Sequence, residues 1–325
     1  MKLLKLVPED TNIAFLKWRV PFYVVSMILI AASWALVMTK GLNYGVDFAG
    51  GQEIRATFTQ SKEAPIAELR EQIGALGYGE PVIQRFGAPN EVSIRVRLPD
   101  DVASDKGAAQ RISNQIVSTV KAGHADFRLD GNDNVSGKVS GEFRQKAIYA
   151  LLAAMLAIAI YIWVRFEWQF GVGALFALFH DVSLTMGMLA LFQLEFSLQI
   201  VAAILAIIGY SLNDTIVVYD RIRENLKKYR RMPIAELLDL SVNETLARTV
   251  MTSLTLLVAL IPLLFFGPAS LFGLTICIVL GIFVGTYSSI YMAAPILVWL
   301  KVTSDSFVAK ESDVERQERL ARERG

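Results

Sequence analysis

Six apolar runs in the sequence are each about as long as a helix that crosses a lipid bilayer. A hydrocarbon core of about 30 Å requires about 20 mostly apolar residues in an α-helix. The composition agrees, because a hydrophobic share of 54% exceeds what soluble chains normally contain. We therefore predict an all-α membrane bundle of six transmembrane helices, at residues 20–39, 147–164, 171–192, 197–219, 250–266 and 271–300.

The distribution of basic residues predicts how the chain is inserted. Lys and Arg in short loops mark the cytoplasmic side of a membrane protein. They precede the first run and follow the fourth, whereas the turns at 193–196 and 267–270 contain none. Both termini, residues 1–19 and the charged tail 301–325, are therefore expected in the cytoplasm. The basic residues concerned are Lys2, Lys5, Lys17, Arg19, Arg221, Arg223, Lys227, Lys228, Arg230 and Arg231.

Residues 40–146 separate the first two runs and are polar enough to fold in water, outside the cytoplasm. Some stretches alternate with the period of half-buried strands, and others have helical spacing. In chain order they predict a strand at 54–58, a helix at 65–77, strands at 82–86 and 92–98, a helix at 105–121 and a strand at 125–130. The order β-α-β-β-α-β predicts an inserted α+β domain of the ferredoxin-like kind.

Residues 220–248 form a cytoplasmic loop within the helical region 147–300. After Pro233, apolar residues recur along one stripe of a predicted helix, and acidic residues lie on the other side. This pattern indicates either an amphipathic helix at the membrane face or a plain surface connector. Neither interpretation requires chemistry.

Ionisable residues inside the apolar runs are the candidates for function, because each costs about 2.5–3.5 kcal/mol on membrane insertion scales. Asp214 precedes Asp220, at the cytoplasmic end of the fourth run, by about 9 Å of helix. His180 and Asp181 lie near the middle of the third run. Arg248 begins the fifth span on the same side as Asp214.

Asp214 is the strongest candidate for a proton-carrying residue. Desolvation favours the neutral form of a carboxyl group and a nearby guanidinium favours the charged form, so a movable Asp–Arg contact can switch protonation. The alternative is a fixed hydrogen-bonded partner of Asn213, Thr215 or a neighbouring helix. Arg248 is either the charge partner of Asp214 or an anchor whose guanidinium reaches the interface.

His180, Asp181 and Asn213 have two interpretations. They belong to a proton relay, or they clamp helices together through hydrogen bonds. Nothing in the sequence predicts a catalytic arrangement, a cofactor, a metal site or a nucleic-acid partner. We therefore expect a membrane transport component and not an enzyme.

Four stretches of the chain carry a family resemblance. They are GLNYGVDFAGG at 41–51, FHDVSLTMGMLALFQLEFSL at 179–198, GYSLNDTIVVYDRIREN at 209–225 and NETLARTVMTS at 243–253. With these motifs, nearly the whole chain resembles the SecF subunits of bacterial SecD–SecF protein-export complexes. That family belongs to the resistance–nodulation–division superfamily, whose members have twelve spans in two six-span halves.

The resemblance implies a heterodimer with SecD in the bacterial inner membrane and a periplasmic position for the domain at 40–146. It also implies association with the SecY–SecE–SecG channel and YajC, and proton-motive-force-driven assistance to the export of unfolded preproteins. Asp214 matches the family's proton-carrying aspartate, and Arg248 matches its arginine at the start of the fifth span. Two alternatives remain: a half-transporter for lipids or drugs, and a purely structural translocon subunit.

Overall fold

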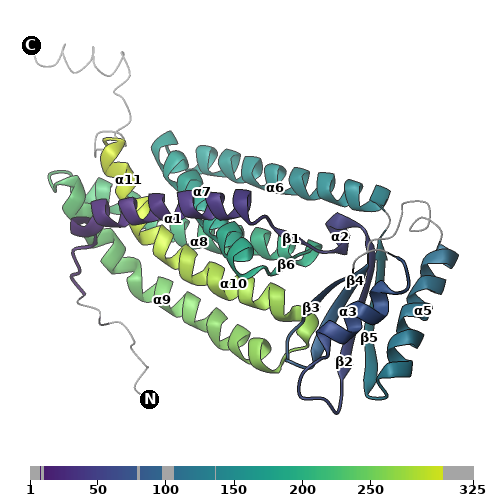
Figure 1. The fold of residues 1–325 in the computed structure, drawn as a ribbon. Coiled ribbons are helices and arrows are strands. Elements are labelled where there is room, and N and C mark those ends of the chain that lie inside the picture. Colours follow the sequence, from purple (N-terminus) through teal and green to yellow (C-terminus); the bar gives the residue numbers. More distant parts are fainter. Residues whose placement is uncertain (1–7, 9–10, 79–80, 97–105, 136, 303–325) are drawn as a thin grey trace, which may run out of the picture.

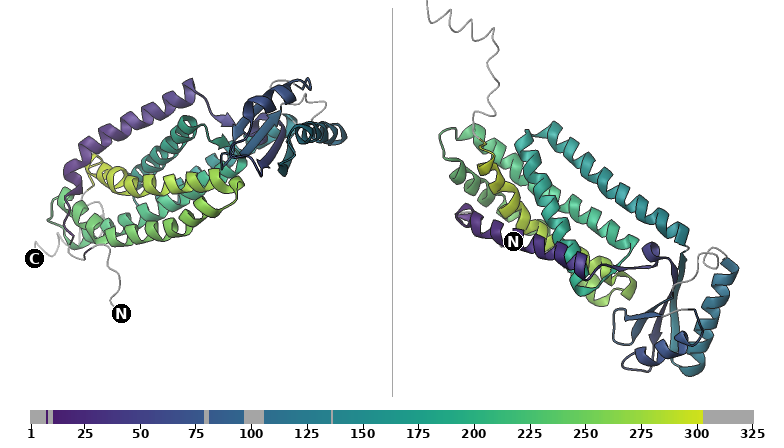
Figure 2. Two further views of the ribbon diagram at one scale, coloured as in Figure 1. Left: turned by 60° about the horizontal axis from the view of Figure 1, so that its bottom comes forward. Right: turned by 45° about the horizontal axis from the view of Figure 1, so that its top comes forward.

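The computed structural model describes residue 8 and residues 11–78, 81–96, 106–135 and 137–302. Long helices form a bundle, and a small sheet domain lies beyond one end of it (Figures 1 and 2). The first and last helices of the described chain both reach the opposite end of the bundle. The bundle consists of η1 (Phe15–Trp18), α1 (Arg19–Thr39), α6 (Gly137–Arg165), α7 (Trp168–Phe192), α8 (Leu198–Lys228), α9 (Ile234–Phe266), α10 (Ala269–Ser288), η2 (Ser289–Ala293) and α11 (Ala294–Trp299).

The prediction of six membrane-spanning helices is confirmed by the length and composition of the helices. Several of them are longer than the apolar runs that predicted them: α6 begins at Gly137 and α8 continues to Lys228. A helix need not stop where the hydrocarbon ends, because its backbone hydrogen bonds are internal. The spans are Phe15–Thr39, Val139–Arg165, Trp168–Phe192, Leu198–Lys228, Ile234–Phe266 and Leu271–Trp299.

The sheet domain has the predicted element order. It comprises β2 (Gly51–Phe58), α3 (Ile66–Gly74), β3 (Val82–Arg85), β4 (Glu91–Val96), α5 (Lys106–Gly123) and β5 (Phe127–Val135). The strand order is β3-β4-β2-β5, and all three pairings are antiparallel. The long strand β2 is therefore central, and its residue Ile54 lies opposite Ile94 of β4.

The two faces of this sheet are different. Ile54, Ala56 and Phe58 of β2 point to an apolar core that α3 and α5 complete. The alternate residues of β2 are polar, and Glu53 among them is 0% exposed. Half-buried strands normally turn their polar face to water. Here that face is covered instead, because it meets the end of the helix bundle.

A short two-stranded sheet joins the domain to the bundle. Its strands are β1 (Asn43–Tyr44), directly after α1, and β6 (Glu195–Phe196), in the turn between α7 and α8. They pair in parallel, with Asn43 opposite Glu195. After β1, the short helix α2 (Val46–Ala49) begins, and its Asp47 accepts a hydrogen bond of 2.8 Å from the Leu198 amide of α8.

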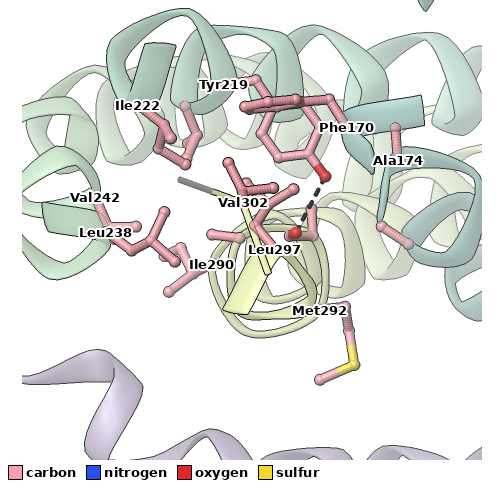
Figure 3. Close-up of a cluster of buried hydrophobic side chains, with 14 of the residues drawn as sticks. Phe170, Ala174, Tyr219, Ile222, Leu238, Val242, Ile290, Met292, Leu297 and Val302 are labelled. Atoms are coloured by element: carbon pink, nitrogen blue, oxygen red, sulfur yellow. Dashed lines mark hydrogen bonds between the residues drawn. The ribbon is translucent and has the colours of Figure 1, made fainter. Parts of the chain in front are cut away.

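The amphipathic stretch within residues 220–248 is not a separate helix. It forms the beginning of α9, which continues without interruption into the fifth span and past Pro262 to Phe266. Its apolar stripe, with Leu238 and Val242, packs against α8 and α11 and not against the membrane face (Figure 3). The stripe predicted from sequence is real, but other helices of the bundle bury it.

The last span contains a π-helical segment. Between α10 and α11, η2 (Ser289–Ala293) has this wider backbone, which leaves carbonyl groups free for side chains. Tyr219 donates a hydrogen bond of 3.0 Å to the Ala293 carbonyl (Figure 3). Tyr23 donates one of 2.6 Å to the Met292 carbonyl. Upstream, Gly285 lies so close to Ser211 that any side chain there would press against α8.

Candidate functional site

Asp214 lies inside the bundle, on the side of α8 that faces α9 and η2. It is 3% exposed. Its Oδ1 accepts a hydrogen bond of 2.6 Å from the Thr249 hydroxyl of α9. Its Oδ2 is also buried, and it has no hydrogen-bond partner among the residues that the structure describes. The carboxyl group therefore has one neutral donor and one unsatisfied oxygen.

Ser289 in η2 lies beside this carboxyl group but is already occupied. Its hydroxyl donates to the Gly285 carbonyl at 2.8 Å and lies 3.3 Å from the Thr215 hydroxyl. A hydroxyl has a single hydrogen to donate. Ser289 could turn to Asp214 only by releasing Gly285. The site therefore contains a hydroxyl that can change partners.

Asp181 is satisfied to a much greater degree. Its carboxylate accepts hydrogen bonds from His180 Nδ1 at 2.9 Å, from Ser211 at 2.5 Å and from Ser288 at 2.8 Å. These donors belong to α7, α8 and α10. Asp181 thus links three helices at one point, which is the geometry expected of a helix clamp.

His180 is fully buried beside Asp181. Its Nε2 has no hydrogen-bond partner within the described ranges. The ring lies 5.7 Å from the Tyr287 ring, measured between centroids. The Tyr287 hydroxyl is 2.8 Å from that of Ser26 on α1. A row of polar groups therefore leads from Asp181 toward the first helix.

Asp181 and Asp214 are linked to neighbouring residues of the same helices, but no hydrogen bond joins them directly among the described residues. Ser211, which bonds Asp181, precedes Asp214 by three positions on α8, so the two share a helix face. Ser288 and Ser289 are likewise adjacent on the last span. No hydrogen bond between the two carboxyl groups exists in the part of the chain that the structure covers.

The structure does not bring Arg248 or Asn213 to Asp214. Arg248 is exposed although it directly precedes Thr249, because consecutive helix residues point about 100° apart. Among the described residues its guanidinium forms no ion pair with Asp214. Asn213 is also exposed, on the outer side of α8. The predicted Asp–Arg contact is therefore absent from this conformation of the described chain.

The hydroxyl groups around the two carboxyl groups were not predicted from the sequence. Thr249, Ser211, Ser288 and Ser289 are all buried. Each is a small polar residue within an apolar run, which is a weak signal because such residues also form hydrogen bonds within their own helix. What singles them out is the helix packing, which turns Ser211 and Ser288 to Asp181 and Thr249 to Asp214, with Ser289 beside it.

Within the described ranges, no three His, Cys, Asp or Glu side chains are grouped so that they could hold a metal ion. The Asp214 carboxyl group, with its hydroxyl donor, can gain and lose a proton and exchange hydroxyl partners.

Two family models match the chain. One describes the C-terminal part of the protein export membrane proteins SecD and SecF and covers residues 115–303. The other describes the SecD/SecF GG motif and covers residues 35–62, which include strand β1 and the Gly50-Gly51 pair. Together the models cover the bundle from α6 onward, the end of α1 and the connection to the sheet domain.

Curated relatives and solved structures match over most of the chain. The protein translocase subunit SecF of Rhodobacter capsulatus is 42% identical over 91% of this chain and 91% of its own length. The SecF of Vibrio alginolyticus is 37% identical over 97% and 98%.

The crystal structure of SecDF from Thermus thermophilus, described as a translocon-associated membrane protein, matches with a TM-score of 0.78 at 34% identity. A second SecDF structure, in a super-membrane-facing form, matches with a TM-score of 0.66 at 36% identity. Each match covers 90% of this chain but 39% of the SecDF chain.

Proposed function

The chain belongs to the SecD/SecF family of protein export membrane proteins, as a multi-pass inner-membrane subunit associated with Sec translocation, and we propose that it uses the proton motive force through Asp214. The observation that carries this proposal is the buried Asp214 carboxyl group with one hydroxyl donor and one unpartnered oxygen. A carboxyl group buried without a cation is costly as an anion, so this setting suits a group that binds and releases a proton.

Protonation changes what Asp214 can do with its neighbours. As an anion it accepts only, and Thr249 supplies one donor. As an acid it also donates, and the Ser289 hydroxyl of η2, which lies beside it, can accept. Each proton that enters the cell contributes about 2.3 kcal/mol per 100 mV, enough to bias an element whose two states differ by a few kcal/mol.

We assign Arg248 to another stage of the cycle. Since it points away from Asp214 here, it would approach only after α9 turns or tilts relative to α8. Ionised Asp214 would favour that movement, because an opposite charge stabilises a buried anion. Thr249 and Arg248 would then alternate as partners of the carboxylate. His180 and Asp181 have the role of a clamp, around which the helices can move.

SecD is the proposed partner in the membrane. The chain matches 39% of the SecDF chain, so the larger part of that chain corresponds to something absent here. The spans α6 and α9 are largely exposed, whereas α8 is the most buried. At Gly209 on α8, nothing lies within 4 Å of where a side chain would begin. These exposed apolar faces and this open position leave room for the helices of SecD.

The sheet domain is proposed to lie in the periplasm, with both termini in the cytoplasm. The positive-inside pattern and the six spans support this orientation. The domain is fastened directly after α1 and against the turn between α7 and α8, so a change among the helices would reach it. There it would hold or release an emerging preprotein beside the SecY–SecE–SecG channel, with YajC. Membership of a protein-export family favours this role over lipid or drug transport.

The test is preprotein translocation in inverted membrane vesicles with matched amounts of this chain and SecD. Asp214→Asn keeps the size of the side chain and removes titration, so the gradient-stimulated part of translocation should be lost. Asp220→Asn is the matched control, because Asp220 lies on the same helix in an exposed ion pair with Arg165. Full stimulation with Asp214→Asn would leave the structural interpretation of Asp214.

A further inference from the structure

A second group of charged residues, of which Glu53 is buried, lies outside the helix bundle, where the polar face of the sheet meets the two-stranded β1–β6 sheet, here called the joint. Glu53 of β2 is fully buried, with Arg55 Nη2 at 2.6 Å from one carboxylate oxygen and the Ser93 hydroxyl at 2.7 Å from the other. Arg55 is also 3.6 Å from Asp133 of β5. Glu53 is thus held firmly as part of the sheet domain.

Glu195 brings a second carboxyl group to this place from the bundle. It belongs to β6, and the missing side chain of Gly45 makes room for it, because a Cβ at Gly45 would collide with the Glu195 carboxyl oxygen. Glu53 lies opposite Arg95 in the β2–β4 pairing, and Arg95 binds the side chain of Asn43. Asn43 is paired with Glu195 in the β1–β6 sheet, and Glu53 and Glu195 line the same cavity. Neighbouring carboxyl groups form a hydrogen bond with each other only when one of them carries a proton.

Nearby guanidinium groups do not neutralise Glu195 directly. Arg95 donates to the Tyr44 carbonyl at 2.5 Å and to the Asn43 side chain at 2.8 Å. Glu195 forms no ion pair with any residue in the described ranges. Burial, and then the nearby Glu53 carboxylate, raise the pKa of Glu195 from 4.5 to about 7, while Arg95 and Arg55 act in the opposite direction.

Water can reach this contact. A cavity of about 470 Å³ lies between the sheet and the end of the bundle and includes both carboxyl groups in its wall. The other charged residues that line it are Asp47 of α2, Arg55 of β2, Arg85 of β3 and Asp133 of β5. Protons can therefore exchange between this contact and the solution without crossing the helix bundle.

We propose that Glu53 and Glu195 form a shared proton-binding site that fastens the sheet domain to the turn between α7 and α8. With the proton in place, the two carboxyl groups are joined by a hydrogen bond. Without it, two adjacent carboxylates repel each other across the joint and weaken the β1–β6 pairing. This inference concerns the joint alone and does not depend on Asp214.

The sign of the pH effect follows from linkage. The closed joint holds the proton more tightly than an open joint, in which Glu195 has its ordinary pKa. The free energy of closure is therefore greatest at low pH and declines as the pH rises from about 4.5 to about 7, above which both states are ionised. The difference between a pKa of 4.5 in the open joint and about 7 in the closed joint limits the change in the opening equilibrium to about 300-fold.

Hydrogen exchange of the full-length chain in lipid nanodiscs measures this opening. The reporter peptides contain residues 40–48 and 193–199, and exchange times are corrected for the intrinsic pH dependence. We expect opening of the joint to increase between tenfold and hundredfold from pH 5 to pH 8. Glu195→Gln supplies a permanent amide donor to Glu53, so this variant should stay protected at both pH values. The matched control is Glu71→Gln, on the exposed side of α3.

A second variant and a second measurement keep the test independent of folding defects in Glu195→Gln. Gly45→Ala should displace the Glu195 carboxyl group and make the joint open at pH 5 as well. Infrared spectroscopy of the unaltered chain labelled with ¹³C-glutamate should show one protonated carboxyl group that disappears between pH 5 and pH 8. Equal protection of the unaltered chain at both pH values, or a Glu195→Gln variant with the same pH response as Glu71→Gln, would overturn the proposal.

Discussion

The two carboxyl sites of this protein, one in the bundle and one at the joint, have different neighbouring groups. In the bundle, Asp214 has a single hydroxyl donor and no ion pair with any of the described residues. At the joint, Glu53 and Glu195 lie among guanidinium groups, and Arg55 binds Glu53 directly. Hydroxyl groups exchange partners at little cost, so the bundle site is suited to change. At the joint, the Arg55–Glu53 ion pair lies within β2 and holds Glu53 in place, so the contact with Glu195 is the part that can open.

The two sites also differ in what they can sense. Asp214 lies within a membrane span, so a proton that reaches it from one side crosses part of the membrane potential. Glu195 lies in the turn between two spans, next to a cavity open to the end of the bundle. It should respond to the pH of its own compartment and not to the potential. Variants at the two sites can therefore separate these inputs.

The largest expected effect comes from the carboxyl group of Asp214. Gradient-stimulated translocation should fall in the order unaltered chain, Asp214→Glu, Asp214→Asn, because Glu still titrates but its extra methylene crowds a close helix contact. Glu195→Gln should keep its response to the membrane potential. Translocation in inverted vesicles with the potential and the pH gradient set separately measures both. If Glu195→Gln lost the response to the potential, the two sites would not be distinct in the way proposed.

Asp181 should matter for stability more than for gradient response. Asp181→Leu removes the acceptor for His180 and Ser211, while Ser288 can still donate to the Gly285 carbonyl at 3.1 Å. Each unsatisfied buried donor costs about 1–3 kcal/mol, so a loss of several kcal/mol in the free energy of unfolding is expected. Denaturant unfolding in detergent measures it. Asp214→Leu, which strands only Thr249, is the matched comparison, and an equal loss there would contradict the clamp interpretation.

Arg248 should matter for translocation more than for stability. Since its side chain is exposed and pairs with nothing among the described residues, Arg248→Ala should change the free energy of unfolding by less than about 0.5 kcal/mol. Translocation should nevertheless fall severalfold or more, and Arg248→Lys should restore part of it. A simple anchor would also be replaced by Lys, so the distinguishing result is the rate with Arg248→Gln. An unchanged rate with Gln would identify an anchor.

The smallest effect is expected for Thr249, the uncharged partner of Asp214. Thr249→Val keeps the shape of the side chain and removes the hydroxyl that donates to Asp214. The cost should be about 1 kcal/mol in stability, together with a change of a few fold in gradient-stimulated translocation. Thr255→Val, at an exposed position further along α9, is the control. Identical results for the two variants would mean that Thr249 has no special relation to Asp214.

Features with a local signal were predictable from the sequence. The six spans follow from apolar length, and the β-α-β-β-α-β order follows from periodicity within short stretches. The joint could not be predicted in this way, because β1 and β6 have two residues each and lie far apart in the chain. The burial of Glu53 could not be predicted from the sequence either. Its alternation with apolar residues indicates a solvent-facing side, and only the adjacent bundle covers it.

The candidate site was predictable in its charged residues but not in their partners. An aspartate within an apolar run stands out because of its cost in the membrane. The sequence does not reveal which side of α9 faces this aspartate, because either Arg248 or the next residue, Thr249, could occupy that position. The π-helical turn at Ser289 is a further reason, because it shifts the helix register at the position where a hydroxyl meets the carboxyl group.

The most direct test of the central claim is a measurement of proton movement. Proteoliposomes would contain this chain, SecD and the SecY–SecE–SecG channel, with a pH-sensitive dye inside and a membrane potential imposed. Addition of preprotein should stimulate proton flux with the unaltered chain and with Asp220→Asn, and it should produce none with Asp214→Asn. Preprotein-stimulated flux of undiminished size in the Asp214→Asn vesicles would contradict the assignment of Asp214 as the proton carrier.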